Sequence, residues 1–246
     1  MNYDESPLRE LTGNCLRPGG PELTLRGLAL CAFAPKALVL DLGCGAGASL
    51  ALLRGAGIAP LGLDASERLL SEARACAPVL RADMAALPLA AASLDGIVCE
   101  CALSLAGDKA AVLRECCRAL KPGGRLLLCD LVRREEGAGP PAAGGVPPCV
   151  PCAAGAQSAS ALAGLLAGAG FSVLAVEDHT QALRELAARI VWRFGSLAAF
   201  AALMPGNDET GGGNAACDGG KGLGYCLMVA EKSVNKERDP HEITGR

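Results

Sequence analysis

Three aspartates stand where their carboxylates could bind a ligand. Asp41, Asp64 and Asp83 each lie at, or just beyond, the end of a short apolar run. Runs of this length, bounded by glycine and polar residues, are typical of buried strands. Ligands of open α/β sheets bind beyond the carboxyl ends of parallel strands, so we expect the three carboxylates to line one crevice. Together they could accept hydrogen bonds from amino and hydroxyl groups.

A glycine-rich turn follows the first of these runs, in the string Asp41-Leu-Gly43-Cys-Gly45-Ala-Gly47. Glycine allows a tight turn with φ > 0 and a close approach of the backbone to a ligand. Asp64, at the end of the next predicted strand, could accept both hydroxyls of a ribose. The string from Gly43 to Ala48 also satisfies a relaxed dinucleotide fingerprint, so a nicotinamide dinucleotide is one alternative.

Two features favour a ligand without phosphate. The carboxylate of Asp41 would repel a pyrophosphate but suits a cationic amino-acid group. Asp83 could accept a hydrogen bond from the exocyclic amine of adenine, and Met84 offers a backbone amide and an apolar face. An amino group, a ribose and an adenine together describe S-adenosylmethionine, which we predict as the cofactor.

Four motifs resemble those of the class I S-adenosylmethionine-dependent methyltransferases. They are LDLGCGAG (40–47), GLDAS (62–66), RADMAALPLAAASLDGIVCE (81–100) and LKPGGRLLLCD (120–130), in the order and spacing of that family. The chain is similar to its small-molecule branch, which includes quinone-precursor methylases and bacterial proteins of unassigned substrate. The resemblance implies that cofactor binding involves Asp41, Gly43, Cys44, Gly45, Gly47, Asp64, Ala65, Asp83, Met84, Glu100 and Cys101.

Strands that alternate with helices predict an α/β fold. We expect a Rossmann-like, seven-stranded, mostly parallel sheet with helices on both faces and an antiparallel last strand at 223–231. A cap or substrate segment at 1–36 would precede the methyltransferase domain at 37–231. That domain would contain a flexible insertion at 137–157, one long helix at 178–203 and a loose loop at 205–222. A disordered tail is expected at 232–246.

Composition restricts the partners. The net charge is −3 and aromatic residues are 3% of the chain, so nothing indicates a nucleic-acid partner. No apolar run reaches the roughly 20 residues that a membrane span needs, and the N-terminus lacks the pattern of a signal peptide. We expect a cytoplasmic protein that acts on a small molecule. Most of the 13 cysteines are expected to be reduced thiols in the core. The sequence does not give the oligomeric state.

Methyl transfer from a sulfonium needs alignment more than an obligatory catalytic residue. Glu100 and His179 are the weak candidates for a catalytic role, while Arg17 and Arg26 are expected to be solvated. A base is needed only where the acceptor must lose a proton early.

Cys149-Val-Pro-Cys152 is a lone pair of cysteines, too few for a zinc site, and no metal is expected. As an alternative, Cys15, Cys149 and Cys152 could bind a thiophilic acceptor such as trivalent arsenic. In a further alternative, the chain is an inactive methylase fold that serves as a binding module.

Overall fold

The computed structural model describes residues 8–12, 15, 17–134, 151–202 and 222–234. In these ranges one mixed sheet runs in the order β3-β2-β1-β4-β5-β8-β7, with the short β6 paired to β5 outside that path. All neighbours pair in parallel except β8, which is antiparallel to β5 and β7. The strands are β1 (Leu38–Leu42), β2 (Ala59–Asp64), β3 (Val79–Arg81), β4 (Leu94–Glu100), β5 (Leu120–Arg133), β6 (Gln157–Ser158), β7 (Phe171–Asp178) and β8 (Leu223–Lys232).

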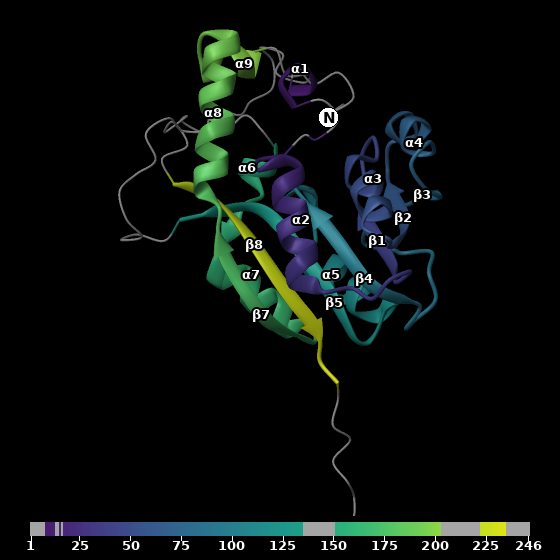
Figure 1. The fold of residues 1–246 in the computed structure, drawn as a ribbon. Coiled ribbons are helices and arrows are strands. Elements are labelled where there is room, and N and C mark those ends of the chain that lie inside the picture. Colours follow the sequence, from purple (N-terminus) through teal and green to yellow (C-terminus); the bar gives the residue numbers. More distant parts are fainter. Residues whose placement is uncertain (1–7, 13–14, 16, 135–150, 203–221, 235–246) are drawn as a thin grey trace, which may run out of the picture.

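Helices cover both faces of this sheet (Figure 1). One core cluster packs α5 and α7 against the sheet, and a second packs α2, α3 and α8 against the other face. The helices are α1 (Leu8–Thr12), α2 (Gly20–Cys31), α3 (Ala48–Gly55), α4 (Glu67–Ala73), the 3-10 turn η2 (Leu103–Leu105), α5 (Lys109–Ala119), α6 (Pro151–Ala154), α7 (Ala159–Gly168), α8 (Thr180–Phe194) and α9 (Leu197–Ala202). The predicted Rossmann-like fold with an antiparallel last strand is therefore confirmed.

Side-chain caps begin three of the helices that flank the sheet. The hydroxyl oxygens of Ser66 and Ser158 accept hydrogen bonds from the first turns of α4 and α7, and the carboxylate of Asp108 does the same for α5. Such caps satisfy backbone N–H groups that have no partner inside the helix. They fix where each helix begins after the preceding strand or loop.

The predicted single helix over 178–203 is wrong. Gly195 has φ +82° and ends α8, and α9 begins two residues later at Leu197. A left-handed residue at this position is a common helix terminator. In Figure 1, α8 extends away from the sheet and lies beside α1 and α9. Ile190 of α8 and Phe200 of α9 form a small cluster that Leu11 of α1 joins.

The predicted irregular insertion is also wrong at its C-terminal end. Pro151–Ala154 forms α6, and Gln157–Ser158 adds β6 to the sheet edge of β5. Proline is well suited to the first turn of a helix because the missing N–H has no partner there. Residues 135–150, 203–221 and 235–246 lie outside the described residues, and with them most of the predicted insertion, of the loop predicted at 205–222 and of the tail predicted at 232–246. None of the helices within the described ranges has the length and apolar character that crossing a membrane requires.

Candidate cofactor and acceptor site

The glycine-rich loop between β1 and α3 adopts backbone conformations that favour glycine. The φ angle is +80° at Gly43 and +52° at Gly45. A Cβ atom added at Gly43 would lie 2.5 Å from Cβ of Ala102, so a side chain has no room there. A Cβ atom added at Gly45 would have no neighbour within 4 Å in the part of the chain that the structure describes. The loop is therefore packed against protein at Gly43 and open to a ligand at Gly45.

Asp64, at the end of β2, braces this loop. Its Oδ2 accepts a hydrogen bond of 2.9 Å from the backbone N of Gly45, and its Oδ1 accepts one of 2.9 Å from Ser66. The backbone N of Cys44 donates to the carbonyl of Leu63 at 3.0 Å, which ties the loop to β2. A carboxylate has about four acceptor sites, so Asp64 keeps capacity for further donors such as ribose hydroxyls.

The three predicted acids lie along one edge of the sheet, because β3, β2 and β1 are adjacent and parallel. Asp41 is in β1, Asp64 ends β2, and Asp83 follows β3 by two residues. Asp83 is exposed, and its Oδ1 accepts a hydrogen bond of 2.8 Å from the backbone N of Ala85. Met84 is half-buried and packs against the core. The arrangement fits an elongated ligand that spans three strand ends.

Three further residues of the predicted cofactor set lie in this loop or after the neighbouring strand β2. Cys44 is buried, and burial raises the pKa of its thiol strongly. Gly47 caps the N-terminus of α3 with φ +91°. The carbonyl oxygen of Ala65 accepts a hydrogen bond of 3.3 Å from Nε of Arg81. Their roles toward a cofactor stay predictions.

Asp41 is a buried acid with an unused oxygen. It is 2% exposed, and its Oδ2 has no hydrogen-bond partner within the described residues. Burial and, to a smaller extent, the negative charge of Glu100 raise the pKa of Asp41 to about 8, although the positive charge of Arg17 partly opposes this rise. A cationic group placed beside Oδ2 would supply the missing partner and favour the ionised carboxylate. The site at Asp41 is therefore suited to an ammonium group.

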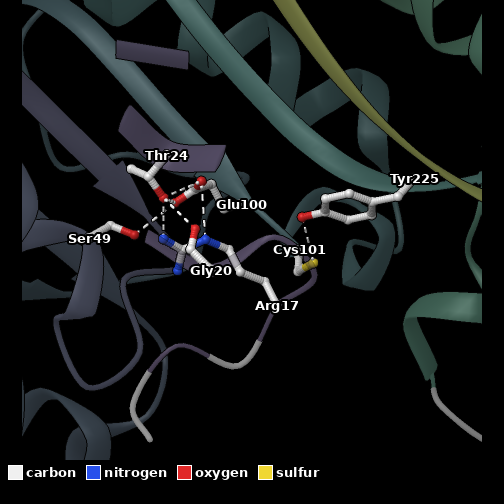
Figure 2. Close-up of polar contacts among 7 residues, drawn as sticks. All are labelled: Arg17, Gly20, Thr24, Ser49, Glu100, Cys101 and Tyr225. Atoms are coloured by element: carbon white, nitrogen blue, oxygen red, sulfur yellow. Dashed lines mark hydrogen bonds and ion pairs between the residues drawn. The ribbon is translucent and has the colours of Figure 1, made fainter. Parts of the chain in front are cut away.

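Glu100, at the end of β4, lies in a buried polar cluster with residues from three other parts of the chain (Figure 2). Its Oε1 accepts a hydrogen bond of 2.9 Å from the hydroxyl of Thr24 in α2, and its Oε2 accepts one of 2.7 Å from the hydroxyl of Ser49 in α3. Nε of Arg17 lies 3.1 Å from Oε1, and the same guanidinium donates a hydrogen bond to Thr24. Because Ser49 is in the first helical turn after the glycine loop, this cluster connects Glu100 to the loop.

These contacts affect two sequence predictions. Both oxygens of Glu100 accept hydrogen bonds, and Oε1 also pairs with Arg17, so this carboxylate is held by more partners than Asp64. Its catalytic role stays a prediction. The expectation that Arg17 is solvated is wrong, since the residue is 7% exposed and paired with Glu100. Arg17 stands directly before the turn that starts α2, but nothing in the local sequence indicates that it faces inward. Arg26 is more than half exposed, as expected, and pairs with Glu177 at 2.5 Å.

Cys101 follows Glu100 and has a strained backbone. Its φ angle is +52°, which is uncommon for a residue with a side chain and is often found at functional sites. Its Sγ lies 3.2 Å from the phenolic oxygen of Tyr225 in β8, as Figure 2 shows. Burial raises the pKa of Cys101 well above its ordinary value, and nearby Asp130 and Cys152 raise it further. A thiol, a phenol and a second thiol thus gather near the end of β4.

His179 is distant from this centre. It directly precedes α8, and its Nε2 lies 2.9 Å from the carboxylate of Glu177. Two strands stand between β4 and β7 in the sheet, which places the ends of β4 and β7 about 14 Å apart at the usual strand spacing. The structure does not bring His179 together with Glu100, its fellow catalytic candidate.

The thiols in the described ranges are reduced, and most are buried, as predicted. Cys152 lies on α6. Burial is the largest cause of the raised pKa of Cys15, and the charges of Arg17 and Glu100 lie close enough to affect that pKa as well. Cys149, the other member of the predicted pair, lies outside the described residues. Within the described part of the chain, no three histidine, cysteine or acidic side chains gather closely enough to hold a metal ion.

Comparisons with known proteins agree on one family. A methyltransferase domain model matches residues 40–128. An arsenite methyltransferase of Aquipseudomonas alcaligenes is 37% identical over 133 residues, and a demethylmenaquinone methyltransferase of Corynebacterium kroppenstedtii is 38% identical over 97 residues. These matches cover 45% and 39% of this chain but only 38% and 42% of the two proteins. The crystal structure of the [4+2]-cyclase SpnF is similar with a TM-score of 0.64 and 25% identity, over 87% of this chain and 81% of that one.

Proposed function

This chain carries a methyltransferase domain of the class I S-adenosylmethionine-dependent family, and on that premise we propose that it methylates a small-molecule acceptor. The cofactor supplies an electrophilic methyl group on a sulfonium, which is displaced in line by the acceptor. The contribution of the protein is to bind both partners in line and to exclude water. The observation that carries the proposal is the buried oxygen of Asp41, which has no hydrogen-bond partner among the described residues, beside a glycine loop that is open at Gly45.

The residues at the strand ends fit the parts of this cofactor. Asp41 offers a carboxylate oxygen to an ammonium group, and Asp64 offers two oxygens to a ribose while it braces the loop. Asp83 and Met84 lie at the next strand end, where they would contact the adenine. The charged side chains among these residues are acids, which would repel a pyrophosphate. This repulsion disfavours a nicotinamide dinucleotide.

Binding of the cofactor can be tested directly. Titration calorimetry with S-adenosylhomocysteine is expected to give saturable binding to the wild-type protein. Asp64→Ala should lower that affinity at least a hundredfold, because it removes the ribose acceptor and the brace of the loop. Asp108→Asn is the matched control, since asparagine can still cap α5 and the contacts of the Asp108 side chain are with Ala111 and Arg114. Absence of binding to the wild type, or tighter binding of a nicotinamide dinucleotide in competition, would overturn the proposal.

A thiophilic acceptor is the second candidate. The observation in its favour is that Cys101 and Cys152 lie near one another at the end of β4, with Cys15 close to Glu100 in the same region. One of the relatives is an arsenite methyltransferase. Trivalent arsenic binds thiolates, and binding would displace the protons that burial favours on Cys15 and Cys101. An organic acceptor, as in the demethylmenaquinone relative, would use the same space without binding to sulfur.

Cysteine variants can distinguish a thiophilic acceptor from an organic one. With arsenite as acceptor, Cys152→Ser is expected to lower the rate of methyl transfer at least a hundredfold and to leave the affinity for S-adenosylhomocysteine unchanged. Cys117→Ser, in α5 on the other face, is the control and should keep the wild-type rate. Equal rates in the two variants would remove the thiophilic candidate. No turnover with any acceptor, despite cofactor binding, would instead favour a binding module.

A further inference from the structure

The turn before α2 is fixed to the sheet by a buried charge pair. Residues 17–20, here termed the arginine turn, contain one buried cation, and Arg17 lies 3.1 Å from the carboxylate of Glu100. Thr24 is fully buried and bridges the two, because its hydroxyl accepts from Arg17 and donates to Glu100 (Figure 2). This pair joins the N-terminal part of the chain to the end of β4.

Stability alone is a weak reason for such a pair. Removing two charges from water costs free energy that their attraction only partly offsets, and apolar side chains of similar size are often as stabilising. Arg26, in α2, pairs with Glu177 at the surface, where neither charge has to be removed from water. The buried pair therefore suggests a role in fixing a particular arrangement.

The arrangement that it fixes is at the site. Glu100 also accepts a hydrogen bond from Ser49, in the first turn after the glycine loop, and it directly precedes the strained Cys101. Arg17 is close enough to Asp41 and Tyr225 for their charges to affect it. The arginine turn thus lies over the carboxyl ends of β1 and β4, between the proposed cofactor loop and the proposed acceptor side.

We infer that Arg17 is a positioning residue that, through Glu100 and Thr24, holds the arginine turn as a wall of the site and slows the escape of the bound cofactor. The inference rests on the proposed function. It assigns Arg17 no contact with the reacting atoms. It predicts that weakening the pair raises the dissociation rate of the cofactor at least tenfold in a protein that still folds.

The test measures S-adenosylhomocysteine dissociation by displacement and hydrogen exchange of residues 17–20. Arg17→Gln is expected to speed dissociation at least tenfold and to raise amide exchange in the arginine turn. Arg17→Lys, which keeps the charge, should recover part of both effects. Thr24→Val, which keeps the shape but removes the bridging hydroxyl, should change both in the same direction by a smaller factor, and it covers the case in which Arg17→Gln does not fold.

Arg26→Gln is the matched control and should behave as the wild type, since it removes an arginine of α2, the helix that follows the arginine turn, from an exposed pair. Wild-type dissociation and exchange in folded Arg17→Gln and Thr24→Val would overturn the inference while the proposed function stands. A wild-type protein that binds no S-adenosylhomocysteine would remove the proposed function and this inference with it.

Discussion

Asp41→Asn is expected to raise the free energy of unfolding at pH 8 while it weakens binding of S-adenosylmethionine. The unfolded chain titrates Asp41 near pH 3.9, whereas burial, together with the charge of Glu100, raises the folded pKa to about 8. Between these values folding takes up a proton, so the wild-type protein loses stability as the pH rises from about 4 to about 8. Asparagine does not titrate and so avoids this loss. The free energy of unfolding of Asp41→Asn should exceed that of the wild type by a few kcal/mol at pH 8, and the difference should vanish near pH 4.

The same substitution should remove the pH dependence of cofactor binding. At pH 6 the carboxyl of Asp41 is protonated, and an ammonium ligand must displace that proton to gain an ionised partner. Wild-type affinity is therefore expected to rise by up to about tenfold per pH unit from pH 6 toward pH 8, with proton release. Asp41→Asn should bind at least a hundredfold more weakly at pH 8, with little dependence on pH.

Two measurements check this pair of effects. Denaturant unfolding at several pH values gives the stability, and calorimetry in buffers of different ionisation enthalpy counts the protons released on binding. Asp108→Asn, which replaces an exposed carboxylate at a helix cap, is expected to change neither. If Asp41→Asn bound the cofactor as tightly as the wild type at pH 8, Asp41 would not be the partner of the ammonium group.

The geometry of the proposed cofactor side was predictable because its signals are local. A strand, a glycine turn and a helix follow one another between residues 38 and 55, and each has a strong pattern of its own. Ser66 begins α4 as its sequence position indicates. The adjacency of Asp41, Asp64 and Asp83 then follows from parallel strand order, which short right-handed connections make nearly obligatory.

The rest of the site depends on contacts between distant segments. Arg17 and Glu100 are far apart in the chain, and each alone resembles an ordinary polar residue near a turn. Tyr225 reaches Cys101 only because β8 inserts between β5 and β7, an order that no local pattern specifies. The break at Gly195 was missed for a different reason, since the apolar periodicity continues into α9. Packing among these parts, rather than local preference, decides the acceptor side.

Gly45→Ala is expected to abolish cofactor binding without unfolding the protein. The added Cβ would meet no atom of the described residues within 4 Å, so the cost to stability is mainly that of φ +52°, about 1–2 kcal/mol. The space into which the Cβ would project is where the open side of the loop should approach the cofactor. A methyl group there would hold the ligand away from the backbone, and we expect affinity for S-adenosylhomocysteine to fall at least a hundredfold.

Gly57→Ala separates the two effects. Gly57 has φ +77°, and an added Cβ there would likewise have no neighbour within 4 Å across the described ranges. It lies between α3 and β2, at the opposite end of the strands from the loop. It should therefore lose a similar amount of stability and keep the wild-type affinity. Gly43→Ala should be the least stable of the three, because its Cβ would also meet Ala102. Melting temperatures and calorimetry measure both quantities, and tight binding by a folded Gly45→Ala protein would show that the cofactor does not lie against this loop.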